Sequence, residues 1–147
     1  MNFNTKRDTF FKRLWIAIIV LINALFLLPL IFDEVNLTAL IIGISLDVII
    51  CGFMIWIAVD ISYHVKEDYL LVKGGPFKSK IKYKDITKIS GNTNIWIGYR
   101  ILFSNDAIEV YYKTGSMGSV VISPDNKKEF IAQLVQRNQS ITIENMD

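Results

Sequence analysis

Two long apolar stretches occupy most of the first 60 residues. Residues 14–32 contain no charged side chain, and residues 39–59 contain only one, Asp47. At a rise of about 1.5 Å per residue, either stretch covers most of a hydrocarbon core about 30 Å thick. Residues 33–38 are enough only to connect two antiparallel helices. The pattern therefore predicts a transmembrane hairpin over residues 14–59, with helices at 14–32 and 39–59.

The basic residues that flank the hairpin predict its orientation. Four of them precede the first apolar stretch: Lys6, Arg7, Lys12 and Arg13. The connection at 33–38 has no basic residue and two acids. The positive-inside rule then places both termini in the cytoplasm of a multi-pass plasma-membrane protein, with residues 1–13 as a basic cytoplasmic N-terminus. A cleaved signal peptide is disfavoured, because the first stretch is longer than a signal-peptide core and a second span follows.

Two polar residues lie within the predicted hairpin. Asn23 and Asp47 are about equally far from its turn, so they fall at similar depth and are predicted to form a hydrogen-bonded pair. Ala39, Gly43, Asp47 and Cys51 recur every four residues and predict a helix contact face. Helix packing is the favoured role, and a proton or ligand site is the alternative.

From residue 60 onward, the apolar positions alternate over short runs rich in β-branched and aromatic residues. Gly, Asn, Asp and Pro cluster between these runs, as in tight turns. The pattern predicts an antiparallel meander with strands at 61–65, 69–74, 77–83, 86–90, 95–103, 107–113 and 119–123.

The period of the apolar positions changes to that of a helix after residue 123. Ser123 is a suitable N-cap and Pro124 a suitable first residue, and an apolar stripe that includes Phe130 and Leu134 follows. One helix on a strongly bent sheet predicts an α+β fold, a β-barrel or sandwich over residues 60–138 capped by that helix. Residues 139–147 are expected to be a flexible tail.

Charge and chemistry narrow the function classes. A net charge of +2 among 147 residues is too small for a nucleic-acid-binding face, so no nucleic-acid partner is expected. The single cysteine excludes an intramolecular disulfide, and His64 is the only histidine. No catalytic motif or metal-ligand spacing occurs, so we expect a non-enzymatic protein without a cofactor or metal.

Two surfaces are candidates for binding. Alternating lysines predict a basic strand face that could contact anionic lipid head groups: Lys78, Lys80, Lys82 and Lys84, extended by Lys73 and Lys88. The competing interpretation is a solvated outer sheet face, or an edge strand that lysine protects against aggregation. Trp96 and Tyr99 lie in a glycine-flanked segment that could be a protein-binding loop, although alternating apolar residues are also typical of a core.

Several segments resemble the bacterial YyaB-like PH domains. They are DYLLVKGGP at 68–76, YKDITKI at 83–89, SNDAIEV at 104–110, and ISP at 122–124 before Phe130 and Leu134. The resemblance covers residues 60–138 and implies a PH-like fold, commonly preceded by one or two membrane helices. It also implies a binding module for a peptide or membrane-protein partner, most concretely a self-immunity protein against a sublancin-type bacteriocin. A lipid-sensing or scaffolding role at the inner leaflet is the alternative function.

Overall fold

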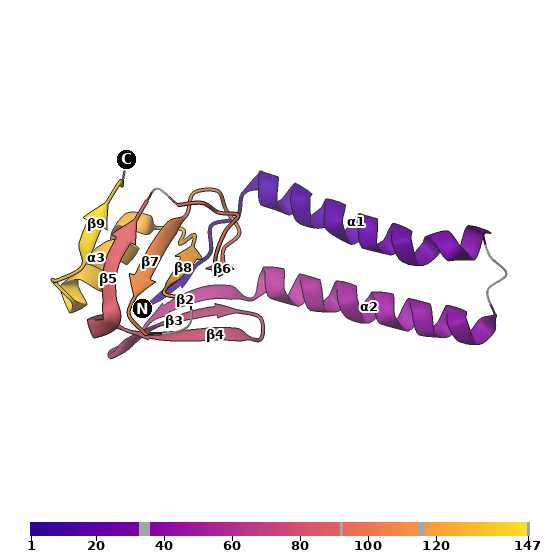
Figure 1. Cartoon of the computed structure of the whole chain (residues 1–147), viewed down its shortest axis with the longest axis horizontal. Coiled ribbons are helices and arrows are strands. Elements are labelled where there is room, and N and C mark those ends of the chain that lie inside the picture. The colour runs from indigo at the N-terminus through magenta and orange to yellow at the C-terminus, as the bar shows by residue number, and fades with distance from the viewer. Residues whose placement is uncertain (33–35, 92, 115–116, 147) are drawn as a thin grey trace.

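The computed structural model describes residues 1–32, 36–91, 93–114 and 117–146. It consists of two N-terminal apolar helices that extend from one end of a PH-like domain of two β-sheets and a C-terminal helix (Figure 1). The expected α+β fold class is confirmed.

The two N-terminal helices are α1 (Thr9–Phe32) and α2 (Leu37–Val59), and both are long and apolar enough to cross a membrane. Helix α1 begins before the apolar stretch, because the Asp8 carbonyl accepts from the Lys12 backbone N–H at 3.1 Å and opens a helical turn. Helix α2 begins after Asn36, whose side chain accepts from the Ala39 N–H at 2.8 Å. Residues 33–35 of the predicted turn lie outside the described residues.

The first sheet is antiparallel, with the strand order β1 (Asn2–Asn4), β2 (Ile61–Val65), β3 (Tyr69–Gly74) and β4 (Phe77–Lys82). Its first strand comes from the segment expected to be only a basic N-terminus. Phe3 is buried in the core, and Asn2, Phe3 and Asn4 pair with His64, Tyr63 and Ser62. The domain thus consists of two chain segments, and the helical pair is inserted between β1 and β2.

The second sheet has the order β6 (Arg100–Ile101), β8 (Ser119–Ile122), β7 (Ile108–Tyr112), β5 (Ile86–Ser90) and β9 (Thr142–Glu144). It differs from the predicted meander, because β6 is parallel to β8 and β9 is parallel to β5. Strand β9 lies in the expected flexible tail. Asn138 holds this segment by donating from Nδ2 to the carbonyls of Tyr83 and Ile86, at 2.8 and 3.2 Å, and Ile141 is buried.

The predicted strand at 95–103 is reduced to the two residues of β6. Asn94 turns the chain before it, since its side chain accepts from the Trp96 N–H at 2.9 Å and its carbonyl from the Ile97 N–H at 3.3 Å. Gly98 then adopts a φ of 86°, a left-handed conformation that suits glycine. Strand β4 ends at Lys82, where the short 3-10 helix η1 (Tyr83–Asp85) begins.

The C-terminal helix α3 (Lys127–Arg137) begins later than predicted, with Asn126 rather than Ser123 as its N-cap. The Ser123 hydroxyl is buried and accepts from the Phe103 N–H at 3.0 Å, so it is not available to cap the helix. Asn126 and Glu129 instead bond reciprocally, in the manner of a capping box. Figure 1 shows α3 at the end of the domain away from α1 and α2.

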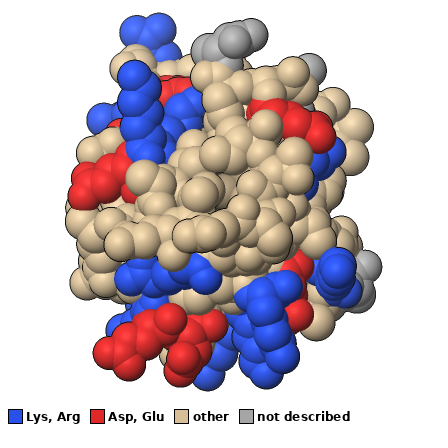
Figure 2. All heavy atoms as spheres, turned by 90° about the vertical axis from the view of Figure 1, so that its left-hand side faces the viewer, with Lys and Arg blue, Asp and Glu red and all other residues tan. Residues whose placement is uncertain are grey.

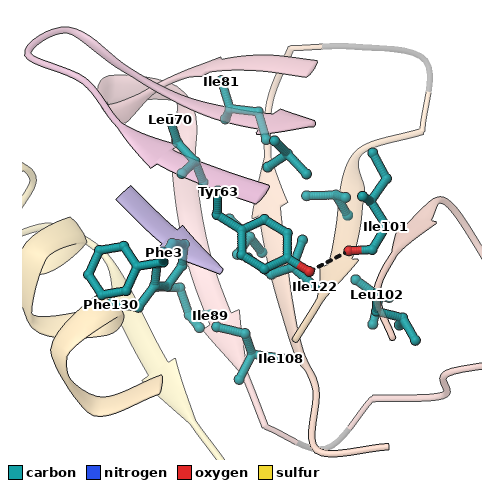
Figure 3. Close-up of a cluster of buried hydrophobic side chains, with 14 of the residues drawn as sticks. Phe3, Tyr63, Leu70, Ile81, Ile89, Ile101, Leu102, Ile108, Ile122 and Phe130 are labelled. Carbon is teal, nitrogen blue, oxygen red and sulfur yellow. Dashed lines mark hydrogen bonds between the residues drawn. The ribbon is translucent and has the colours of Figure 1, made fainter. Parts of the chain in front are cut away.

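The core lies between the two sheets and α3. Tyr63 is fully buried at its centre, and its hydroxyl donates to the Ile101 carbonyl at 2.7 Å (Figure 3). The same oxygen lies 3.2 Å from Thr5 Oγ1 and accepts from the Ser123 N–H at 3.1 Å. These bonds join both sheets and the segment after β1. Burial raises the pKa of the Tyr63 hydroxyl, which therefore stays protonated.

Candidate functional site

The segment between β1 and α1 fixes the helices to the domain. The Asp8 carboxylate accepts from the Ser104 hydroxyl at 2.6 Å and from the Asn105 N–H at 2.9 Å. Arg7 Nη2 donates to the Val59 carbonyl at 2.8 Å, so a cation stabilises the C-terminal end of α2. These contacts hold the adjacent ends of α1 and α2 against the domain.

Aromatic side chains fill much of this junction. The Phe11 ring lies 6.5 Å from the Trp96 ring in a stacked arrangement and 6.0 Å from the Phe103 ring. The Trp15 ring stacks on Phe103 at 6.1 Å, and Phe10 lies edge-on to Trp96 at 6.4 Å. Because these rings come from α1, from the β5–β6 loop and from the chain after β6, they bind the helix to the domain through apolar contact.

Beside these rings lies a cavity of about 480 Å³, which we call the junction groove. Ligand sites commonly enclose about 300 to 1,000 Å³. One wall is formed by Ile18 of α1 and Ile57 of α2, and the other by the domain. The described residues that line it are Phe11, Trp15, Ile18, Ile57, Ile61, Gly74, Phe77, Ile95, Trp96, Gly98, Tyr99, Arg100, Ile101, Leu102 and Met117.

The lining of the junction groove is apolar except for a few groups. Among the described residues that line it, Arg100 has the only ionisable side chain besides Tyr99, and none is an aspartate or glutamate. Arg100 is exposed, and its side chain makes a long hydrogen bond of 3.4 Å from Nη1 to the Ile95 carbonyl. The Tyr99 hydroxyl is paired with Ser79 Oγ at 2.9 Å. The groove therefore presents a mainly apolar surface and one positively charged side chain, that of Arg100, which can bind a ligand.

Large apolar side chains surround this end of the domain and remain exposed. Phe77 is 53% exposed and Trp96 is 56% exposed, and Ile97 and Met117 are also exposed. Phe77, Trp96 and Met117 also line the junction groove, and Ile97 follows Trp96 in the chain. Apolar surface of this kind, gathered beside a groove, marks an interaction site.

Both candidates of the predicted binding loop, Trp96 and Tyr99, line the junction groove. The sequence did not single out Arg100, Phe77 or the aromatic residues at the start of α1. A signal was present, because Phe10, Phe11 and Trp15 bracket the basic pair Lys12 and Arg13 where the apolar stretch begins.

The structure does not bring the six candidate lysines together. Lys73 of β3 and Lys78 of β4 are cross-strand partners at the end nearest the helices, and Lys80 and Lys82 follow on the same face. Lys84 lies in η1, and Lys88 belongs to β5 in the other sheet. Two are ion-paired, Lys73 with Asp60 at 2.8 Å and Lys88 with Glu144 at 3.2 Å.

The lysines of the first sheet, Lys73, Lys78, Lys80 and Lys82, form what we call the lysine row. This row runs parallel to the axes of the helices. Figure 1 shows β2, β3 and β4 extended in roughly the same direction as α1 and α2. Four residues of strand span about 13 Å, so Lys82 lies about that much farther from the helices than Lys78. Figure 2 views the end away from the helices, where basic and acidic side chains gather side by side along the lower edge. That end presents a mixed surface instead of a basic face.

Asn23 and Asp47 are connected through Cys51 rather than directly. Asn23 Nδ2 donates to the Ile19 carbonyl at 2.8 Å and lies 3.3 Å from Cys51 Sγ, which in turn donates to Asp47 Oδ1 at 3.7 Å. The thiol intervenes because Cys51 is one helical turn after Asp47 on the face that meets α1. Asp47 also borders a second cavity of about 550 Å³ between the outer halves of the helices.

His64 has structural partners on the first sheet. Its Nδ1 lies 2.7 Å from Asn2 Oδ1, and its Nε2 lies 3.0 Å from Ser62 Oγ. Partial burial and then the charge of Lys66 lower the pKa of His64. Within the described residues, no group of three or more His, Cys, Asp or Glu side chains could hold a metal ion.

Comparison with known proteins identifies the domain. The sequence model of the family described as "Bacterial PH domain" matches residues 61–138, slightly more than half of the chain. A relative in Bacillus subtilis (strain 168), named "Uncharacterized protein YyaB", is 35% identical over 143 residues, which cover 97% of each chain. No solved structure matches. The chain belongs to the bacterial PH-domain family.

Proposed function

We propose that this protein is a membrane-anchored, non-enzymatic binding module that takes up an apolar or amphipathic ligand in the junction groove. The groove itself carries the proposal, because it joins an apolar lining to two helices long enough to span a bilayer. Aromatic packing and the Asp8 hydrogen bonds hold both of its walls in a fixed relation, which favours binding.

The surface of the helices supports membrane insertion. Almost none of α1 and none of α2 is buried within the protein, although their mean hydropathies are 2.1 and 2.5. Soluble proteins rarely expose so large an apolar surface. The positive-inside rule supports a cytoplasmic position for the domain, because Lys6, Arg7, Lys12 and Arg13 lie at the end of the helices that meets it.

The orientation can be tested by cysteine accessibility in whole cells. In a Cys51→Ser background, Thr38→Cys is expected to react with a membrane-impermeant maleimide, whereas Lys84→Cys should react only after permeabilisation. Both side chains are exposed. The opposite pattern, or equal labelling of the two variants, would refute the cytoplasmic position.

Ligand uptake can be tested with the full chain in nanodiscs of neutral lipid. With Trp56→Phe, the remaining tryptophans are Trp15 and Trp96, which both line the groove. A brominated long-chain alcohol should quench their fluorescence in two parts, a linear part from bulk lipid and a saturable part from the groove.

Ile95→Phe and Ile18→Phe would add volume from opposite walls of the groove. Each is expected to remove the saturable part and leave the linear part unchanged. Ile131→Phe, on α3 at the other end of the domain, is the control. Quenching that is linear in the parent protein would refute groove binding.

The role in bacteriocin self-immunity implied by the resemblance remains a prediction, since the name of the relative assigns no activity. The location of the groove would let it meet a membrane-active peptide. Expression in a strain sensitive to a sublancin-type bacteriocin should reduce killing, and Ile95→Phe should restore it. Unchanged killing by the peptide would eliminate this role.

The alternative lipid-sensing or scaffolding role through the lysine row receives less support. Only Lys73 and Lys78 lie at the helix-proximal end, and Lys73 is ion-paired with Asp60. A charge about 13 Å beyond Lys78 is farther than the screening length of about 8 Å at physiological ionic strength. Lys80 is about 7 Å beyond Lys78, so an anionic lipid contact by this row would rest mainly on Lys78 and Lys80.

A further inference from the structure

We propose that the occupant of the junction groove is an anionic phospholipid, with one acyl chain in the apolar cavity and the phosphate bound by Arg100. This inference rests on the proposed function and names the ligand of the same groove. Its evidence is the continuity of the groove with the helix surface, the charge of the lining, and the exposed apolar rim.

The walls of the groove continue the surface that would contact lipid. Ile18 and Ile57 belong to the two apolar helices and also line the groove. A ligand already in the bilayer could therefore enter sideways and keep its apolar part in contact with carbon throughout. An acyl chain suits this path, because it has no backbone N–H or C=O groups that would need partners.

The charge of the lining favours an anion. Arg100 is the only cation among the described lining residues, and none of them is an acid that would compete for the guanidinium. Among the described residues, Arg100 takes part in no ion pair. A guanidinium presents planar N–H donors that match two phosphate oxygens at once. An amphipathic anion fits better than a neutral ligand.

The rim is consistent with a site at the bilayer surface. Phe77, Trp96, Ile97 and Met117 are exposed in the described structure and lie at the helix-proximal end. In a membrane, these side chains would contact the interfacial layer where phosphate groups are located. Tryptophan is enriched in that layer because its ring is amphipathic. Arg100 would then be at the depth of the phospholipid head groups.

The nanodisc assay with Trp56→Phe tests this ligand directly. Phosphatidylglycerol and phosphatidylcholine, each brominated on the acyl chains, are compared as minor components of the same neutral bilayer. Brominated phosphatidylglycerol should show saturable quenching at lower mole fraction than brominated phosphatidylcholine. Arg100→Gln should reduce this preference about tenfold, on the scale of one charge-assisted hydrogen bond.

Two matched variants separate the groove from general surface charge. Lys128→Gln removes the same charge from α3, at the other end of the domain, and should leave the preference unchanged. Lys78→Gln removes a charge from the lysine row near the helices and should have a much smaller effect than Arg100→Gln.

The outcomes distinguish this inference from the proposed function. If the brominated alcohol binds saturably while the two phospholipids bind equally, ligand uptake in the groove is supported and the anionic phospholipid is refuted as its ligand. An equal loss in Lys78→Gln and Arg100→Gln would refute the specific role of Arg100. If an apolar peptide displaces the alcohol and phosphatidylglycerol does not, the occupant of the groove is a peptide and the phospholipid proposal is refuted. No saturable binding of any probe would refute both proposals.

Discussion

The two ends of the PH-like domain differ in how completely side chains fill them. At the end away from the helices, α3 inserts Phe130 and Leu134, both fully buried, and the Phe130 ring packs edge-on against Phe3 at 5.2 Å. At the end near the helices, partly exposed rings from α1 and the β5–β6 loop leave the junction groove between them. The same two sheets thus have one sealed end and one open end.

This difference separates stability from binding. At the sealed end, each buried apolar group adds to the free energy of unfolding. At the groove, some apolar groups stay unburied, which leaves room for a ligand. Substitutions at the α3 end should therefore affect unfolding, and substitutions at the helix-proximal end should affect ligand uptake. The following predictions test this division from the largest expected effect to the smallest.

Phe130→Ala should cause the largest loss, about 3 to 5 kcal/mol of unfolding free energy, because it leaves a cavity in the sealed end. Denaturant unfolding of the full chain in detergent, followed by near-ultraviolet circular dichroism, measures it. Val135→Ala on the same helix is only half-buried and should cost clearly less. Equal losses in both variants would contradict a tightly packed seal.

Tyr63→Phe should cost about 1 to 3 kcal/mol, because it leaves the Ile101 carbonyl and the Ser123 N–H without their buried partner. Its position between the two ends makes it a test of how they are coupled. Tyr112→Phe provides a control for loss of a hydroxyl from a half-buried tyrosine. Stability equal to that of the parent protein would show that the Tyr63 hydrogen bonds contribute little net free energy.

Trp96→Ala should change unfolding free energy by less than about 1 kcal/mol, because more than half of this side chain is exposed. It should nevertheless remove most of the saturable quenching of Trp15 by brominated phosphatidylglycerol. A large stability loss with intact ligand uptake would reverse the proposed division between the ends.

Asp106→Asn should have the smallest effect, about 0.2 to 1 kcal/mol at neutral pH, because the side chain is partly exposed to solvent. Asp106 pairs with Lys127 of α3 and with Lys6 before α1, so it connects both ends of the domain. Hydrogen bonds from Lys127 and then from Lys6 lower the pKa of the Asp106 carboxyl.

This lowered pKa sets the pH dependence of the Asp106 contribution. It is complete above the ordinary pKa of 3.8 and is lost as the pH falls through the lower pKa of the folded protein. The stability difference between the parent protein and Asp106→Asn should therefore shrink in acid. A difference that is constant between neutral and strongly acidic pH would contradict the ion pairs.

Local pattern in the sequence was sufficient for the elements whose own residues decide them. The two apolar stretches, the strands β2, β3 and β5 with their exact bounds, and the apolar stripe of α3 all follow from short-range periodicity. Turn residues and alternation predicted a helix-capped barrel or sandwich, and the resemblance to the YyaB-like domains implied that it is PH-like. Trp96 and Tyr99 were predicted as binding candidates because they lie in a glycine-flanked segment.

Only the tertiary structure decided what depends on distant partners. Strands β1 and β9 are short and form because β2 and β5 offer them edges, so no local pattern predicts them. The Ser123 hydroxyl accepts from the Phe103 N–H and so does not cap α3. Cys51 lies between Asn23 and Asp47, which the sequence had predicted to pair directly. The junction groove arises where α1, α2 and the domain meet, and Arg100 acquires its place there from packing that its neighbours in sequence do not encode.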